Sequence, residues 1–202
     1  MMQQLQSQTH PTPGVILHDI SWQEYERLLE ILSDKNPGLH LNYLAGVLEI
    51  MPRSSEHEQI KKMIARLLEI YALERGIALY SCGSTTLRNQ SNQRGLEPDE
   101  SYCIGTRKLI PDVAVEVIVT SGGLNRLEIY RGLGVMELWQ WQNQQLTIQF
   151  LNTSQMTYEL TNESRFFSGL SASIVSNYLN PNQEPQMLSA FRRFLQQSQG
   201  HD

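Results

Sequence analysis

The chain has 202 residues, of which 40% are hydrophobic and 18% are charged, and its formal net charge at pH 7 is −5. This composition is typical of one globular domain with a hydrophobic core, and no uninterrupted apolar run is long enough to cross a membrane. A negative net charge argues against a protein that coats nucleic acid non-specifically, because phosphate binding draws on lysine and arginine. We therefore expect a cytoplasmic protein with no membrane partner.

The ends of the chain differ from its middle. Residues 1–14 are expected to form a flexible leader, because they lack the basic start and the apolar segment of a secretion signal. Residues 15–180 are expected to form a single domain, and residues 181–202 a C-terminal helical tail. The two cysteines, Cys82 and Cys103, lack the spacing of a metal site, so we interpret them as reduced thiols without an assigned role.

Two capping boxes predict where helices begin, because a serine and a glutamate three residues later satisfy each other's free backbone donors. The first is Ser21 with Glu24, the second is Ser55 with Glu58, and apolar residues follow each at helical spacing. Up to residue 95 we expect a helix ending near 36–38, strands over 39–44 and 47–51, a long helix ending at Gly76, a strand over 77–87 and a polar loop over 88–95.

The second half of the chain alternates between apolar strands and short helices. In chain order we expect strands over 97–104 and 111–119, a helix from Leu124 to Gly132 or Gly134, strands over 135–141 and 145–151, an edge strand over 156–160, and helices over 170–179 and 187–196. A long helix followed by strands, a helix and further strands predicts an α/β fold with a mixed β-sheet flanked by helices.

The strand over 111–119 carries acidic residues on one face and valines on the other. Because successive side chains of a strand point to opposite faces, Asp112 and Glu116 share a face. Two buried carboxylates are costly unless a positive charge neutralises them, and a divalent cation is a common reason to keep them. If the chain turns back at Gly105, Asp99 lies beside Asp112 and close to Glu116. The sequence therefore predicts a three-carboxylate site for Mg²⁺, with Mn²⁺ as the other candidate ion.

Nucleases of the PD-(D/E)XK type place an acid on each of two neighbouring strands and a lysine two residues after the second acid. The acids hold Mg²⁺ and the ammonium group acts at the phosphate. Here the position two residues after Glu116 is Ile118, so the lysine is missing from the strand. Arg126, on the following predicted helix, is the next basic residue. A guanidinium can stabilise negative charge, but its pKa, above about 12, prevents it from acting as a general base.

Structural interpretations of the same residues stay open at this point. Asp99 follows a proline and is able to cap a turn, Asp112 is able to start a strand, and Glu116 is able to form a buried ion pair with Arg126. His57, in the first turn of the long helix, fits a packed or capping role better than a ligand role.

Several segments together resemble the Uma-two family of restriction-endonuclease-like proteins, over roughly residues 15–151. The segments that carry the resemblance are 55–58, 83–86, 94–102, 111–117, 121–130 and 132–139. The resemblance implies a PD-(D/E)XK core in the main domain, with Asp99, Asp112 and Glu116 as metal ligands and catalytic residues. It places Arg126 at the position of the family's helical lysine.

The resemblance implies a Mg²⁺-dependent DNA endonuclease that acts on double-stranded DNA. Because cutting both strands takes two sites, a homodimer is the expected assembly. Two other functions stay open: a catalytically inactive nuclease fold that serves as a nucleic-acid-binding or interaction module, and a metal-dependent hydrolase of a small phosphorylated substrate. The negative net charge is in keeping with either.

Overall fold

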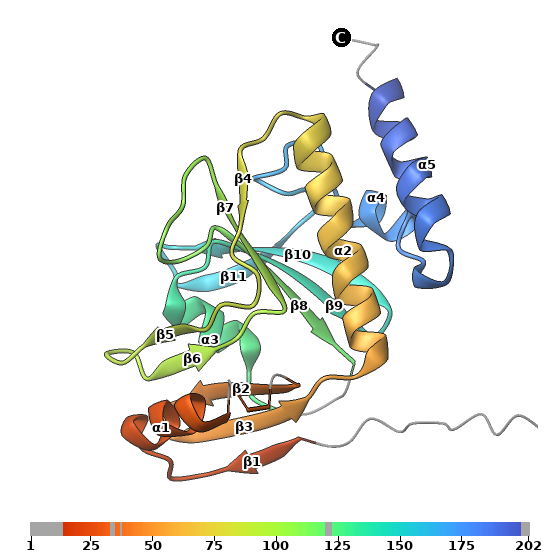
Figure 1. The fold of residues 1–202 in the computed structure, drawn as a ribbon. Coiled ribbons are helices and arrows are strands. Elements are labelled where there is room, and N and C mark those ends of the chain that lie inside the picture. Colours follow the sequence, from red (N-terminus) through yellow and green to blue (C-terminus); the bar gives the residue numbers. More distant parts are fainter. Residues whose placement is uncertain (1–13, 33–34, 37, 120–122, 199–202) are drawn as a thin grey trace, which may run out of the picture.

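Two β-sheets form the framework of the protein (Figure 1). The computed structural model describes residues 14–32, 35–36, 38–119 and 123–198. The larger sheet has six strands, in the spatial order β11 (Thr157–Thr161), β10 (Gln145–Asn152), β9 (Glu137–Gln142), β8 (Val113–Ile118), β7 (Glu100–Ile104) and β4 (Leu79–Ser81). The smaller sheet has five, in the order β1 (Val15–Leu17), β3 (Val47–Pro52), β2 (Leu39–Leu44), β6 (Arg94–Leu96) and β5 (Leu87–Asn89).

The larger sheet is mixed, because β8 and β9 run parallel while its other neighbouring strands are antiparallel. The helices are α1 (Trp22–Leu32), α2 (Ser55–Glu74), α3 (Arg126–Leu133), α4 (Ala172–Asn177), the 3₁₀ helix η1 (Pro181–Gln183) and α5 (Glu184–Gln197). The predicted α/β fold, with a mixed β-sheet flanked by helices, is confirmed. The separate smaller sheet is a difference from the sequence prediction. None of the described helices is both long and apolar enough to cross a membrane.

The helix α2 covers one face of the larger sheet (Figure 1). Its apolar stripe includes Met63, Ile64 and Leu67, which pack in one buried cluster with Val113 and Val115 of β8. Burying an apolar side chain of this size stabilises the fold by about 1.5–3 kcal/mol. The valine face of β8 therefore points to α2, and its acidic face points the other way.

The helix α3 lies on that other face, between the two sheets. Its side chains Ile129 and Tyr130 pack with Ala114 of β8, and with Leu87 and Leu96 from the strands β5 and β6 of the smaller sheet. The chain between the parallel strands β8 and β9 contains α3, which is the crossover that such a pair requires. Residues at the start of α3 therefore lie where the two sheets approach each other.

The two capping boxes have different outcomes. Ser21 and Glu24 exchange backbone and side-chain hydrogen bonds as predicted, with the Glu24 carboxylate accepting from the Ser21 backbone N–H at 2.8 Å. The second box is corrected by one residue, because Ser54, and not Ser55, caps α2 and accepts a hydrogen bond from the backbone N–H of His57 at 3.1 Å. Only Ser55 fits the Ser-x-x-Glu pattern, because the residue three positions after Ser54 is His57 and not a glutamate, so the pattern placed the cap one residue too late.

The region after α2 differs most from the prediction. The predicted strand over 77–87 is wrong beyond β4, because the chain turns at Gly83, which has a φ of 59°. The predicted polar loop over 88–95 is also wrong, because it contains the hairpin β5–β6 that pairs with β2, with Gly95 opposite Tyr43. These short strands exist through pairing with a distant partner, which local sequence patterns do not show.

The remaining elements agree with the prediction or lie outside the described residues. The hairpins β2–β3 and β9–β10, the strand β11 and the helix α5 are confirmed, while the helix predicted over 170–179 is limited to α4. The predicted leader over 1–14, apart from Gly14, lies outside the described residues, as does residue 37. The helix α1 ends at Leu32, before the predicted end near 36–38, and the described residues Lys35 and Asn36 are not helical. The domain boundary before residue 181 stays a prediction. The apolar side of α5 packs in the same buried cluster as the apolar stripe of α2.

Candidate active site

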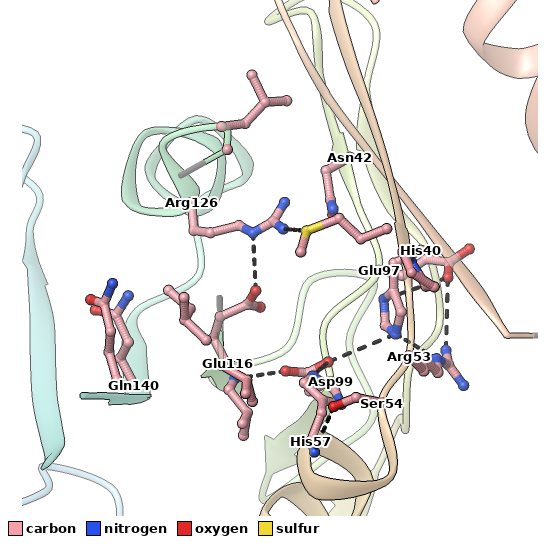
Figure 2. Close-up of a pocket in the computed structure, with 18 of the residues that line it drawn as sticks. His40, Asn42, Arg53, Ser54, His57, Glu97, Asp99, Glu116, Arg126 and Gln140 are labelled. Atoms are coloured by element: carbon pink, nitrogen blue, oxygen red, sulfur yellow. Dashed lines mark hydrogen bonds and ion pairs between the residues drawn. The ribbon is translucent and has the colours of Figure 1, made fainter. Parts of the chain in front are cut away.

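A pocket of about 650 Å³ opens where the two sheets meet (Figure 2). Its walls come from β2 and β3, the start of α2, the residues before β7, and from β8, α3 and β9. The polar lining includes His40, Asn42, His57, Asp99, Glu116 and Arg126. The acidic face of β8 and the first residue of α3 therefore meet in one cavity.

Asp99 lies just before β7 and is 3% exposed. Its Oδ2 accepts a hydrogen bond from the backbone N–H of Val117 at 2.6 Å, and its Oδ1 lies 2.9 Å from Nε2 of His57. Burial by itself raises the pKa of Asp99, but the hydrogen bond and charge of His57 and the backbone donor outweigh it, so the pKa lies below its ordinary value. Asp99 is therefore an anion held in a fixed orientation.

Glu116 lies on β8 and is 6% exposed. Its Oε2 accepts a hydrogen bond from the hydroxyl of Tyr130 at 2.7 Å, and its Oε1 lies 3.1 Å from Nε of Arg126. Burial and the nearby negative charge of Asp99 raise the pKa of Glu116 to about 7, against the opposing effect of Arg126 and Tyr130. The pocket thus holds Asp99, which is ionised at neutral pH, and Glu116, whose carboxyl group ionises near neutral pH.

Arg126 is the first residue of α3, and its guanidinium reaches between two acids. Besides the contact of Nε with Glu116, Nη2 lies 2.7 Å from Oε2 of Glu49 and donates to Sδ of Met51 at 3.1 Å. Nη1 is buried and has no hydrogen-bond partner among the described residues. The ion pair with Glu116, which the sequence left open, is present, and Nη1 is the guanidinium nitrogen whose hydrogen-bonding capacity the described residues leave unused.

Asp112 does not share this pocket. It precedes β8, where both of its oxygens lie 2.6 Å from Nζ of Lys108 and one accepts a hydrogen bond from the backbone N–H of Ile104. Four residues along a strand separate it from Glu116 by about 13 Å. The expected three-carboxylate cluster is therefore corrected, and no group of three or more acidic, histidine or cysteine side chains suited to a metal occurs in the described part of the chain.

The register between β7 and β8 explains why Asp112 does not join Asp99 and Glu116. Glu100 pairs with Val115, so Asp99 lies level with Glu116 and not with Asp112. The turn between β7 and β8 is longer than a tight turn at Gly105 requires, and the extra residues shift the pairing. Strand register depends on how side chains pack on both faces, so alternation within each strand predicted the faces but not which acids are neighbours.

Three residues that the sequence reasoning did not assign to the site contribute to it. His57 contacts Asp99, although the sequence favoured a packed or capping role. His40 lines the pocket, and burial lowers its pKa to about 4, so its ring is neutral at neutral pH. Glu49 holds Arg126 from β3. A signal for Glu49 was present, because it is a lone acid within the apolar strand Val47–Pro52, just as Glu116 is in β8.

Comparison with known proteins gives a family match. A family model named Uma2, described as "Putative restriction endonuclease", matches residues 22–179, which include Asp99, Glu116 and Arg126. No match was found among curated proteins. The family description supports a nuclease-like function, and restriction-endonuclease-like families generally use divalent metal ions and nucleic-acid substrates. On the strength of a match that covers most of its length, the chain belongs to the Uma2 family and has a restriction-endonuclease-like fold.

Proposed function

We propose that this protein is a Mg²⁺-dependent DNA endonuclease in which Asp99 and Glu116 bind the metal and Arg126 contacts the scissile phosphate. The observation that carries the proposal is the arrangement in one pocket of two buried carboxylates and a guanidinium whose Nη1 has no partner in the described structure. A phosphate oxygen is the natural acceptor for that donor, since arginine binds phosphate through several N–H groups.

The donor set fits a hard divalent cation. Mg²⁺ is commonly bound through one or two carboxylates, with water and substrate phosphate oxygens completing its coordination, so the loss of Asp112 from the group does not exclude it. The pKa of Glu116 is raised to about 7 by burial and by Asp99, so the two carboxyl groups disfavour each other's ionisation, and a cation relieves this. Mn²⁺ shares this preference for oxygen ligands.

The side chains have distinct tasks in this proposal. A divalent cation supplies positive charge that polarises the phosphate and makes water a stronger nucleophile at neutral pH. His57 holds Asp99 in place, and Tyr130 holds Glu116. Arg126 donates from Nη1 to a phosphate oxygen and stabilises the charge that develops there. Because arginine stays protonated, it does not remove the proton from the attacking water.

Double-stranded DNA is the proposed substrate, in a cytoplasmic setting. A homodimer is the proposed assembly, because one pocket acts on one strand at a time. The inactive-module alternative is kept as an outcome of the test, because two of the three guanidinium nitrogens of Arg126 already contact acidic side chains.

Plasmid cleavage tests the proposal. The purified protein is expected to cleave supercoiled plasmid in Mg²⁺ and not in EDTA, and Asp99→Asn and Glu116→Gln are expected to lose the activity. Asp112→Asn is the matched control, because it alters an acid next to the same strand outside the pocket, and it is expected to keep the activity. Thermal unfolding of each variant checks that it is folded.

Two results contradict the proposal. Cleavage that persists in Glu116→Gln, or that needs no metal, removes the metal site from the mechanism. An absence of cleavage, combined with no Mg²⁺ or Mn²⁺ binding that depends on Asp99 and Glu116, supports the inactive module instead. Calorimetric titration with each metal ion measures that binding directly.

A further inference from the structure

We propose that Glu49 is a positioning residue that orients the guanidinium of Arg126 toward the pocket. This inference rests on the proposed function of the site, because it concerns how Arg126 meets the phosphate. Glu49 lies on β3 in the smaller sheet, whereas Glu116 lies on β8 of the larger sheet and Asp99 just before β7. Glu49 therefore joins the second sheet to the proposed reaction centre.

The carboxylate of Glu49 is fixed by partners other than Arg126. The side chain is 3% exposed, its Oε2 accepts a hydrogen bond from Nδ2 of Asn42 at 3.2 Å, and its Oε1 accepts one from the backbone N–H of Leu124 at 3.3 Å. Both donors remain when Arg126 is removed. Glu49 is thus a rigid acceptor, and it imposes its own position on the more flexible arginine side chain.

The approach of Glu49 to the chain before α3 requires a glycine at position 123. Gly123 has a φ of 108°, and a Cβ atom there would lie 2.0 Å from Oε1 of Glu49. Real Cβ atoms are not found so close to an oxygen, so a larger residue displaces the carboxylate. The glycine therefore leaves room for the carboxylate of Glu49 beside the chain before α3.

Two contacts at different atoms define the orientation of the planar guanidinium. Nε of Arg126 contacts Glu116 and Nη2 contacts Glu49, so the direction of the third nitrogen, Nη1, follows from the fixed geometry of the group. Nη1 is the buried nitrogen without a partner in the described structure, and Arg126 lines the pocket. Without Glu49, the ion pair of Nε with Glu116 and the weaker contact of Nη2 with Sδ of Met51 remain, so Nη2 loses its charged acceptor and the group turns more freely.

Glu49 also carries a negative charge, and this makes the inference testable. Removing the charge strengthens the attraction of the pocket for a phosphate, whereas loss of orientation slows the chemical step. A role in orientation therefore predicts a lower kcat with an unchanged or lower KM. A purely structural role reduces only the fraction of active protein, so it leaves KM unchanged and leaves kcat per active molecule at the wild-type value.

The direct experiment follows the arginine side chain by NMR. ¹H–¹⁵N spectra of the guanidinium groups are recorded for the wild type, for Glu49→Leu and for Glu49→Gln, and the Arg126 signals are assigned by their absence in Arg126→Lys. The wild type is expected to give separate Hη signals, which indicate restricted rotation. Glu49→Leu is expected to average them, and Glu49→Gln, which keeps an oxygen acceptor, is expected to retain most of the restriction.

The matched control is Glu128→Gln. Glu128 lies on α3 and accepts from Nη2 of Arg94 at 2.9 Å, so this variant removes an acid from an arginine outside the pocket. Its effect is expected at Arg94 and not at Arg126. An Arg126 group that stays restricted in a folded Glu49→Leu protein overturns the inference, whatever the activity.

Kinetics give the second measurement. Glu49→Leu is expected to lower kcat about tenfold to a hundredfold without raising KM, and Glu49→Gln to recover most of the loss. In an Arg126→Lys background, which has no planar group to orient, Glu49→Leu is expected to have little further effect. Equal losses in both backgrounds contradict the inference. If the wild type cleaves no DNA but its Arg126 signals still depend on Glu49, the proposed function fails and the orienting role of Glu49 stands.

Discussion

The raised pKa of Glu116 predicts that the metal-free protein becomes less stable as the pH rises. The pKa lies at about 7, against an ordinary value of 4.5, because of burial and the charge of Asp99. Between these values the unfolded chain has released the Glu116 proton while the folded protein still holds it. The folded state therefore binds more protons, and its stability falls with increasing pH until the proton is lost near pH 7.

The size of the effect follows from the same values. Each tenfold change in proton affinity is worth about 1.4 kcal/mol, so ionisation of Glu116 costs the folded state about 3 kcal/mol above pH 7. A Glu116→Gln variant has no proton to lose at this position. Between pH 5 and pH 8, the free energy of unfolding of the wild type is therefore expected to fall by about 2–3 kcal/mol relative to that of the variant, because part of the difference develops below pH 5.

Urea denaturation in EDTA, at several pH values between 5 and 8, measures this difference. The other titrating groups are common to both proteins and largely cancel in the comparison. Adding Mg²⁺ at pH 8 is expected to restore stability to the wild type, by about 2.7 kcal/mol when its concentration is a hundred times the dissociation constant. The variant is expected to gain much less. Parallel pH curves for the two proteins in EDTA would refute the reasoning.

Three further predictions concern neighbouring residues. Arg126→Ala is expected to lower kcat for plasmid cleavage by about 10²–10³-fold, because a preorganised donor is lost, while Arg126→Lys is expected to retain part of the rate. Equal rates in the wild type and both variants contradict a role of Arg126 at the phosphate. His57→Ala is expected to raise the Mg²⁺ concentration needed for half-maximal cleavage about tenfold or more, because Asp99 loses the partner that orients it; an unchanged metal requirement argues against this. Ser54→Ala is expected to lower the free energy of unfolding by about 1 kcal/mol through loss of the α2 cap. Ser55→Ala, measured by the same urea titration, is expected to destabilise the protein less, and a larger destabilisation by Ser55→Ala would place the cap at Ser55.

Local sequence patterns were sufficient to predict the strand and the helix that carry Glu116 and Arg126. The alternation in β8 predicted that Glu116 faces away from the valines, and the structure confirms it. The position of Arg126 on a helix after Glu116 was also readable, because glycines and the spacing of apolar residues delimit that helix. Such signals depend on residues within a few positions of each other, where the periods of the helix and the strand apply.

Long-range pairing decided which side chains became neighbours. Asp112 and Glu116 share a face in sequence, but the register between β7 and β8 brings Asp99 level with Glu116 and leaves Asp112 with Lys108. Register is set by the turn and by packing on both faces, and a shift of one or two residues alters every cross-strand neighbour.

The sequence by itself determined the α/β class, the family resemblance and two of the acids that line the pocket. Only the tertiary structure decided that a second sheet, completed by β5 and β6, closes the pocket and brings Glu49 to Arg126. The physical reason is that helix and strand periodicity are local properties of the chain. The meeting of Glu49, Arg126 and Glu116 depends instead on packing between segments more than sixty residues apart, which no local pattern encodes.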